Sequence, residues 1–62
     1  MKRFINRQEV QKSTSLSKSN LYKKIKEGTF VKPYSMGGSR VAWLESEVQA
    51  WIQERIDEAG RI

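Results

Sequence analysis

The sequence predicts a small α+β fold made of three short helices and one β-hairpin. Two short helical patterns flank a cluster of hydroxyl residues, a pair of glycines divides two β-rich segments, and an apolar stripe at helical spacing closes the chain. The 62 residues are expected to form a single domain spanning 1–62. A chain this short buries only roughly 60% of its unfolded surface, so its core must be compact.

The first part of the chain predicts an edge strand followed by a helix. The apolar pair at 4–5 is too short for more than an edge strand or an anchoring segment. Asn6, with Glu9 three residues later, resembles a capping box, in which two side chains satisfy the first backbone N–H groups of a helix. A short helix is therefore expected over 7–12.

A second helix is expected over 18–27. The STSLS segment at 13–17 is rich in hydroxyl side chains, which compete with helical backbone bonds and favour turns. Its last residue, Ser17, is a good N-cap, and Gly28 is a natural C-terminal stop. Two short helices joined by a tight turn are typical of a helix-turn-helix motif.

The second predicted helix has one apolar face and one polar, basic face. Leu21 and Ile25 stand one helical turn apart and define the buried side. The opposite side carries Ser19, Asn20, Lys23 and Lys24. On DNA, Asn suits a bidentate contact with adenine and Lys suits guanine. The same residues also suit an ordinary solvated face, and their spacing leaves both interpretations open.

A glycine-tipped β-hairpin is expected next. FVKPY at 30–34 is rich in β-forming residues, although Pro33 restricts it to a sheet edge because proline donates no hydrogen bond. RVAWL at 40–44 predicts the second strand. Between them, Gly37 and Gly38 supply the positive φ angles that a two-residue hairpin turn demands.

The last element is predicted to be a helix that ends at Gly60. Ser46 with Gln49 forms a second capping-box pattern, and Glu47 in the first turn favours the helix dipole. Trp51 could serve as a base-stacking platform, but a stripe at helical spacing indicates a core position. The stripe consists of Val48, Trp51, Ile52 and Ile56.

Helix-turn-helix, glycine-tipped hairpin and closing helix together predict a winged helix-turn-helix. All three helices and both strands contribute to one expected core. Its members are Val10, Leu16, Leu21, Ile25, Phe30, Val41, Trp43, Val48, Trp51 and Ile52.

Basic charge is concentrated in the first two thirds of the chain. Residues 1–40 hold ten Lys or Arg against two Glu, a net charge of +8, whereas residues 41–62 hold two Arg against five acidic residues, a net charge of −3. A basic region on a small domain is typical of a protein with a polyanion partner. Lysine-rich helices can equally serve solubility, so charge alone does not decide the function.

The composition argues against an enzyme and against a membrane protein. The chain has no Cys and no His, which removes disulfides, thiolate metal sites and the usual general base. We expect no catalytic residues, no metal and no cofactor. No apolar run approaches the ~18 residues needed to span a bilayer, and the N-terminus has no signal-peptide core, so a cytoplasmic protein is expected.

Two stretches of the chain carry a resemblance to a known family. SLSKSNLYKKIKEGTF at 15–30 and GGSRVAWLESEVQAWIQER at 37–55, with a weaker match at NRQEV, resemble the AlpA family of prophage regulators. These small DNA-binding proteins are similar to phage excisionases and to the winged-helix head of MerR-type regulators. Ser15 departs from the glycine that the family often has in the turn, and Val31 departs from its common proline.

The resemblance implies a regulator of prophage genes that binds double-stranded DNA. Such a protein activates an excision or integrase gene, or assists excision as an architectural, excisionase-type factor. Residues 17–24 match the family's recognition segment and residues 37–40 its wing tip, so the helix at 18–27 is expected in the major groove and the wing at 36–40 on the backbone or minor groove. The residues expected at base edges are Lys18, Ser19, Asn20, Lys23 and Tyr22, and those expected mainly at phosphates are Arg7, Lys24, Lys26 and Lys32. Arg40 is expected at the narrow minor groove, and the remaining expected DNA contacts are Ser17, Gly37, Gly38 and Ser39.

A protein-interaction module is the alternative from another class. The third predicted helix is acidic and could dock an integrase or another regulator instead of reading DNA. Arg40 could likewise pair with Glu45 or Glu47 rather than with a phosphate. The sequence contains no long heptad repeat, so a monomer or a weak dimer is expected.

Overall fold

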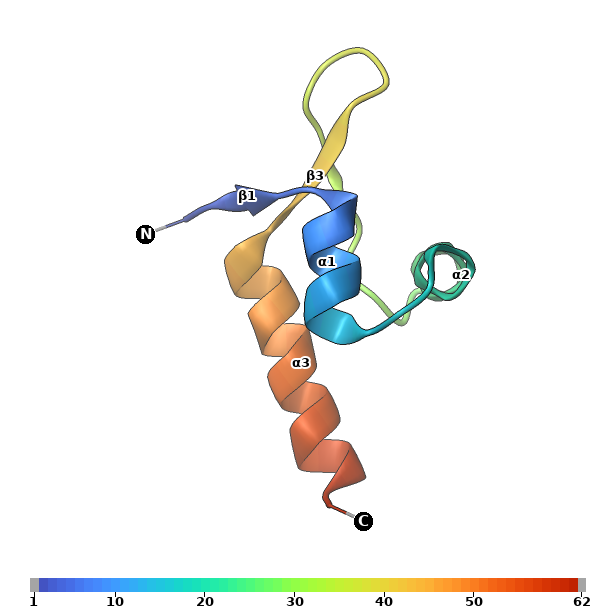
Figure 1. The fold of residues 1–62 in the computed structure, drawn as a ribbon, viewed down its shortest axis with the longest axis vertical. Coiled ribbons are helices and arrows are strands. Elements are labelled where there is room, and N and C mark those ends of the chain that lie inside the picture. Colours follow the sequence, from blue (N-terminus) through green and yellow to red (C-terminus); the bar gives the residue numbers. More distant parts are fainter. Residues whose placement is uncertain (1, 62) are drawn as a thin grey trace.

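The computed structural model describes residues 2–61 and shows the predicted winged helix-turn-helix. The first helix and the second meet through a short turn, a hairpin projects from the body, and the last helix extends to the opposite end of the molecule (Figure 1). The molecule measures 42 × 29 × 19 Å along its principal axes. Its elements are β1 (Phe4–Ile5), α1 (Arg7–Thr14), α2 (Lys18–Glu27), β2 (Tyr34–Ser35), β3 (Val41–Leu44) and α3 (Glu45–Ala59).

The three strands form one antiparallel sheet in the order β1-β3-β2. β1 is the edge strand that the apolar pair at 4–5 predicted. It places Ile5 opposite Trp43, and because facing residues share one side of a sheet, both side chains point into the core. β3 therefore belongs to the hairpin and to the body at once, which ties the hairpin to the core.

The first strand of the hairpin differs from the prediction over 30–34. Only its last residue lies in β2, and the strand continues to Ser35. The preceding segment crosses the core instead, because Phe30 is buried and the carbonyl oxygen of Val31 accepts a hydrogen bond of 3.1 Å from Trp43 Nε1. Pro33, which cannot donate to a ladder, marks the point where the sheet begins.

The hairpin turn is longer than the predicted two residues. The backbone N–H of Met36 donates to the carbonyl oxygen of Arg40 over 2.8 Å, and the N–H of Arg40 donates to the carbonyl oxygen of Gly37 over 3.1 Å. The loop therefore comprises residues 37–39. Both glycines have positive φ, 101° and 57°, as the sequence predicted.

The turn between α1 and α2 is reached without glycine. Ser15 adopts the left-handed conformation, with φ of 61° and ψ of 19°, and its N–H donates to the carbonyl oxygen of Gln11. α1 runs two residues beyond the predicted end at Lys12, because the Thr14 hydroxyl donates to the Val10 carbonyl over 2.8 Å instead of breaking the helix. The predicted cap is confirmed, since the Asn6 side chain accepts the N–H of Glu9.

The start of α3 corrects the predicted capping box at Ser46. The N-cap is Leu44, the last residue of β3 and two residues before Ser46, and it makes no side-chain bond. The N–H of Glu45 instead donates to the carbonyl oxygen of Arg3 over 2.8 Å, so the residue just before β1 supplies an acceptor for the start of the helix. The predicted end at Gly60 is confirmed.

The core confirms most of the predicted set. The exception is Val41, which is 41% exposed because β3 has left the body at that point. Ile5 and Ala42 are buried although the sequence did not single them out, and the α3 stripe runs beyond the core at Ile56, which is 57% exposed. The core consists of Ile5, Val10, Leu21, Phe30, Trp43 and Val48, with Leu16, Ile25, Val31, Trp51 and Ile52 packed against it.

Candidate nucleic-acid interface

The helix α2 is held firmly at both ends and along one face. The Ser17 hydroxyl accepts the N–H of Asn20 over 3.2 Å, and Gly28 closes the helix with φ of 82°. Leu21 is fully buried and Ile25 packs against the core. Losing such a cap costs about 1 kcal/mol of stability. Ser17 therefore stabilises the start of α2 whether or not its hydroxyl also contacts DNA.

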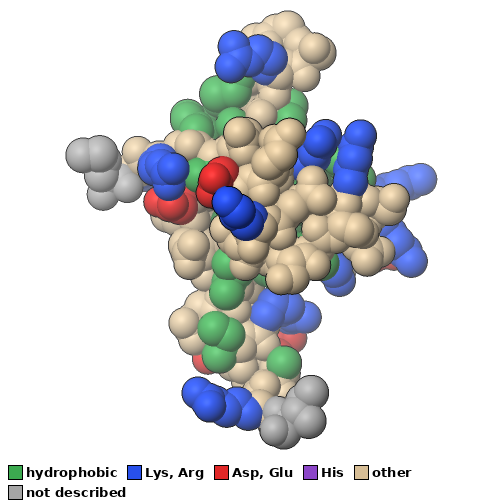
Figure 2. Space-filling model, viewed as in Figure 1, with side chains coloured by type: hydrophobic (Ala, Val, Ile, Leu, Met, Phe, Trp, Pro, Cys, Tyr) green, Lys and Arg blue, Asp and Glu red, His purple; other side chains and the backbone are tan. Residues whose placement is uncertain are grey.

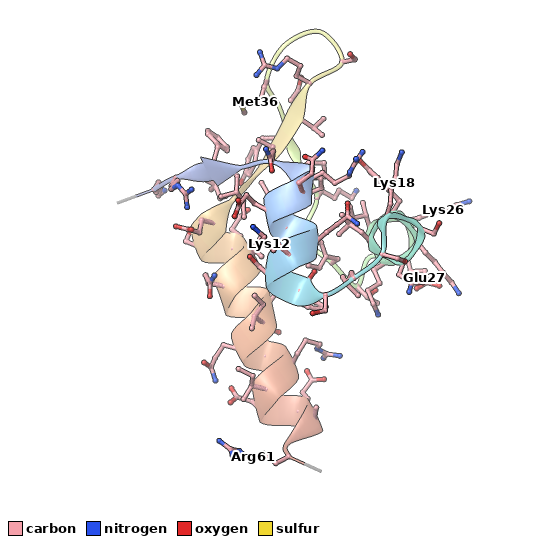
Figure 3. All side chains as sticks on the ribbon, viewed as in Figure 1. Lys12, Lys18, Lys26, Glu27, Met36 and Arg61 are labelled. Carbon is pink, nitrogen blue, oxygen red and sulfur yellow. The ribbon has the colours of Figure 1, made fainter. Side chains whose placement is uncertain are left out.

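The face of α2 opposite Leu21 is polar, basic and exposed. Lys and Arg side chains gather over this helix (Figure 2), and Lys18 and Lys26 extend from it away from the body (Figure 3). One acidic residue of the helix, Glu27, lies at its last position. The residues on α2 that the sequence assigned to base edges are all exposed: Lys18, Ser19, Asn20, Tyr22 and Lys23.

Two of the predicted phosphate contacts are less open than the rest. Lys24 is half-buried and lines a hollow together with Trp51 and Arg55 of α3. Arg7 is also half-buried, and its Nε donates to the side-chain oxygen of Gln11 over 3.1 Å. Both therefore lie at the flank of the α2 surface, whereas Lys26 and Lys32 are exposed.

The tip of the hairpin presents bare backbone beside one cation. An added Cβ at Gly37 or Gly38 would meet nothing within 4 Å, so the positive φ angles rather than crowding favour glycine there. Ser39 and Arg40 complete the exposed tip. The structure thus brings the four predicted wing residues together at the end of the hairpin.

Arg40 is not engaged by the acidic residues considered as its alternative partners. The ion pairs within residues 2–61 join Arg3 to Glu45 and Arg55 to Glu58. Glu47 instead accepts a hydrogen bond of 3.1 Å from the Tyr34 hydroxyl. This bond to the carboxylate, together with its charge, raises the pKa of Tyr34.

Trp43 and Trp51 hold the base of the hairpin in place. Trp43 is fully buried. Trp51 Nε1 donates to the Thr29 carbonyl over 2.7 Å, and its ring meets Phe30 edge to face at 4.8 Å. The interpretation of Trp51 as a core residue is thereby confirmed over the base-stacking alternative. The segment between α2 and the hairpin is therefore hydrogen-bonded to both tryptophans, to Trp51 through Thr29 and to Trp43 through Val31.

The acidic residues near the end of the third helix lie beyond the core, and the first of them, Glu54, lines the hollow beside Lys24 of α2. Glu54, Asp57 and Glu58 are exposed on α3 beyond the core, and Glu58 pairs with Arg55. Like-charge repulsion would keep this part of the protein away from a phosphate backbone. The outer face of α2 is therefore basic, and the acidic residues Asp57 and Glu58 lie further along α3, past this hollow.

A winged helix-turn-helix with an exposed basic second helix defines the class of small regulatory proteins that bind DNA. Residues 3–56 match the family model described as Prophage CP4-57 regulatory protein (AlpA), and the chain belongs to that family. The family is one of regulatory proteins rather than enzymes. The resemblance found in the sequence is thereby confirmed.

A relative from a phage supports the same assignment. The chain is 48% identical over 59 residues to the uncharacterized protein ORF88 of Enterobacteria phage P4, an alignment that covers 95% of this chain and 65% of that protein. This chain thus spans about two thirds of the relative's length. No solved structure gave a significant match. Within residues 2–61, no helix combines the length and apolarity needed to cross a membrane.

Proposed function

We propose that the protein is a phage or prophage transcriptional regulator that binds double-stranded DNA in a sequence-specific manner. Helix α2 enters the major groove, and the hairpin at 36–40 rests on the adjoining backbone or minor groove. The observation that carries this proposal is the exposed polar and basic face of α2, whose opposite face is anchored by Leu21 and Ile25. A capped helix of this size fits the major groove.

The residues of this surface divide into base-reading and positioning groups. Asn20 and Lys23 suit adenine and guanine edges, and Ser19, Lys18 and Tyr22 flank them. Arg40 suits the negative potential of a narrow minor groove. The contacts proposed for phosphates, which position the protein without reading sequence, are Arg7, Ser17, Lys24, Lys26, Lys32 and the tip backbone at Gly37, Gly38 and Ser39.

The proposed function also includes where the protein acts, what it requires and how it assembles. It acts in the cytoplasm on phage or host DNA, without a metal or cofactor, and residues 1–62 form one DNA-binding domain. It binds as a monomer or a weak dimer.

Two matched variants test the division of roles. Asn20→Ala should weaken the preferred duplex by about 10–100-fold and random DNA hardly at all, because a lost bidentate contact costs roughly 1–3 kcal/mol at one base only. Lys32→Ala should weaken both duplexes by the same factor, because a phosphate contact is independent of sequence. Fluorescence anisotropy titrations on a selected and a random duplex provide the four affinities. If Asn20→Ala lowers both affinities equally, α2 does not read bases through Asn20.

A docking role for α3 is the second candidate function. It is favoured by the part of α3 beyond the core, where Ile56 is 57% exposed among Glu54, Asp57 and Glu58. Such a surface could hold an integrase or another regulator. A protein that shifts no fragment in a gel-shift screen across phage and host DNA, yet retains a protein partner, would favour this role over DNA reading.

A further inference from the structure

Met36 is an exposed apolar side chain at the projecting end of the hairpin. It directly precedes the loop at 37–39, is 41% exposed, and does not belong to the core or to the residues packed against it. Figure 3 places it on the part of the hairpin that leaves the body, far from Arg61 at the other end of the molecule. Met36 lines a hollow with Phe4 and Ala42 of the sheet, but it lies outside the core and its side chain remains accessible. No motif or periodicity in the sequence singles out Met36.

The hairpin register sets Met36 beside a cation. Its backbone N–H donates to the carbonyl oxygen of Arg40 over 2.8 Å, so the two residues face each other across the hairpin. Facing residues of an antiparallel pair direct their side chains to the same face. The next pair, Ser35 and Val41, points to the other face. One face of the hairpin end thus combines an unbranched apolar side chain with a guanidinium group.

The loop ahead of this pair is small. Gly37 and Gly38 carry no side chain, and Ser39 carries only a hydroxymethyl group. Met36 and Arg40 are consequently the first large side chains behind the tip. The strand that carries Arg40 is anchored at Trp43, which is fully buried, so a force on the tip is resisted by the core.

Proteins that bind the minor groove use this combination of side chains. Basic residues meet the groove's negative potential, while an apolar wedge, often Phe, Leu, Ile or Met, enters between base pairs and kinks the duplex. Methionine suits a wedge because its unbranched thioether is flexible and polarizable. Resting on the proposed function, we infer that Met36 inserts between two base pairs at the minor groove beside Arg40, and that binding therefore bends the DNA.

The test measures bending and unstacking with a defined duplex. Random-sequence DNA is selected on the full chain, and one recovered duplex is labelled at its ends for energy transfer and with 2-aminopurine at successive steps under the hairpin. The wild-type protein should bend the duplex by roughly 20–90° and raise the 2-aminopurine fluorescence at one step. Met36→Ala should reduce the bend by about half or more and abolish that rise. Met36→Leu should retain both effects.

Val41→Ala is the matched control, because Val41 is equally exposed, at 41%, on the other face of the hairpin; it should bend DNA like the wild type. Full bending and fluorescence with Met36→Ala would overturn the inference, as would a wild-type protein that binds but leaves DNA straight. Met36→Gln, similar in length but polar, provides the same readout should the alanine variant misfold: retained bending would overturn the inference. Failure of the proposed function differs, since the wild type would then select no preferred duplex from the random pool.

Discussion

Replacing Trp43 by alanine is expected to unfold the protein at room temperature. Its side chain is the largest that is fully buried, and removing a buried tryptophan costs roughly 3–5 kcal/mol. The change also leaves the Val31 carbonyl without the hydrogen bond from Nε1. Small domains have a total stability of about 5–15 kcal/mol, and one of this size lies at the low end. The cost is therefore comparable to the whole free energy of unfolding.

Urea titration followed by far-ultraviolet circular dichroism measures this loss. Trp43→Ala should show no cooperative transition, whereas Trp43→Phe, which keeps most of the packing but lacks the donor, should lose only about 1–3 kcal/mol. Trp51→Ala is a useful comparison because Trp51 is only half-buried and should cost less. A Trp43→Ala protein with an unchanged urea midpoint would contradict the described core.

Raising the salt concentration should weaken DNA binding steeply. With about five phosphates neutralised, log K should fall against log salt with a slope of roughly −4.5, so affinity drops about 500-fold between about 50 and 200 mM salt. The physical reason is the release of counterions when cationic side chains replace them on the backbone. Anisotropy titrations at a series of salt concentrations give the slope.

Single charge removals make this measurement specific to the proposed surface. Lys32→Ala should reduce the magnitude of the slope by about 0.9. Arg61→Ala removes the same charge at the far end of the molecule (Figure 3) and should leave the slope unchanged. A slope near zero for the wild type, or equal changes in both variants, would contradict binding through the α2 and hairpin surface.

The parts of the fold that sequence predicts well depend on residues a few positions apart. Asn6 and Ser17 cap their helices through bonds to the third residue beyond, and Gly28 and Gly60 end theirs. The errors came from distant contacts. Ser46 was displaced as a cap because Arg3, remote in the sequence, supplies an acceptor to Glu45.

The hairpin shows the same limit. The β-forming residues of FVKPY predicted a strand, but Phe30 is buried in the core and Val31 bonds to Trp43. Val41 and Trp43 stand two residues apart, so strand alternation places both on the core face, yet alternation does not reveal where a strand leaves the body. Because Ser35 pairs with Val41, the turn is longer than the predicted two residues, and Met36 lies at the exposed end of the hairpin.

The candidate site on α2 was more accessible to sequence reasoning. Helical periodicity fixes which side chains oppose Leu21 and Ile25, and the five predicted base-reading residues are all exposed. The same periodicity predicts Lys24 on the exposed side, and this is wrong: Lys24 is half-buried, because α3 lies beside α2 there through Trp51 and Arg55. The charges of Arg7 and Lys24 alone gave no indication that both lie at the flank.

The central claim is that the α2 surface reads a DNA sequence. The most direct measurement compares the affinities of the wild-type chain for a duplex selected from random DNA and for an unselected duplex, at one physiological salt concentration. The proposed mechanism predicts a ratio of at least about 10³, the low end for sequence-specific binding proteins. A ratio near one would show that the basic surface binds DNA without reading it, and would contradict the claim.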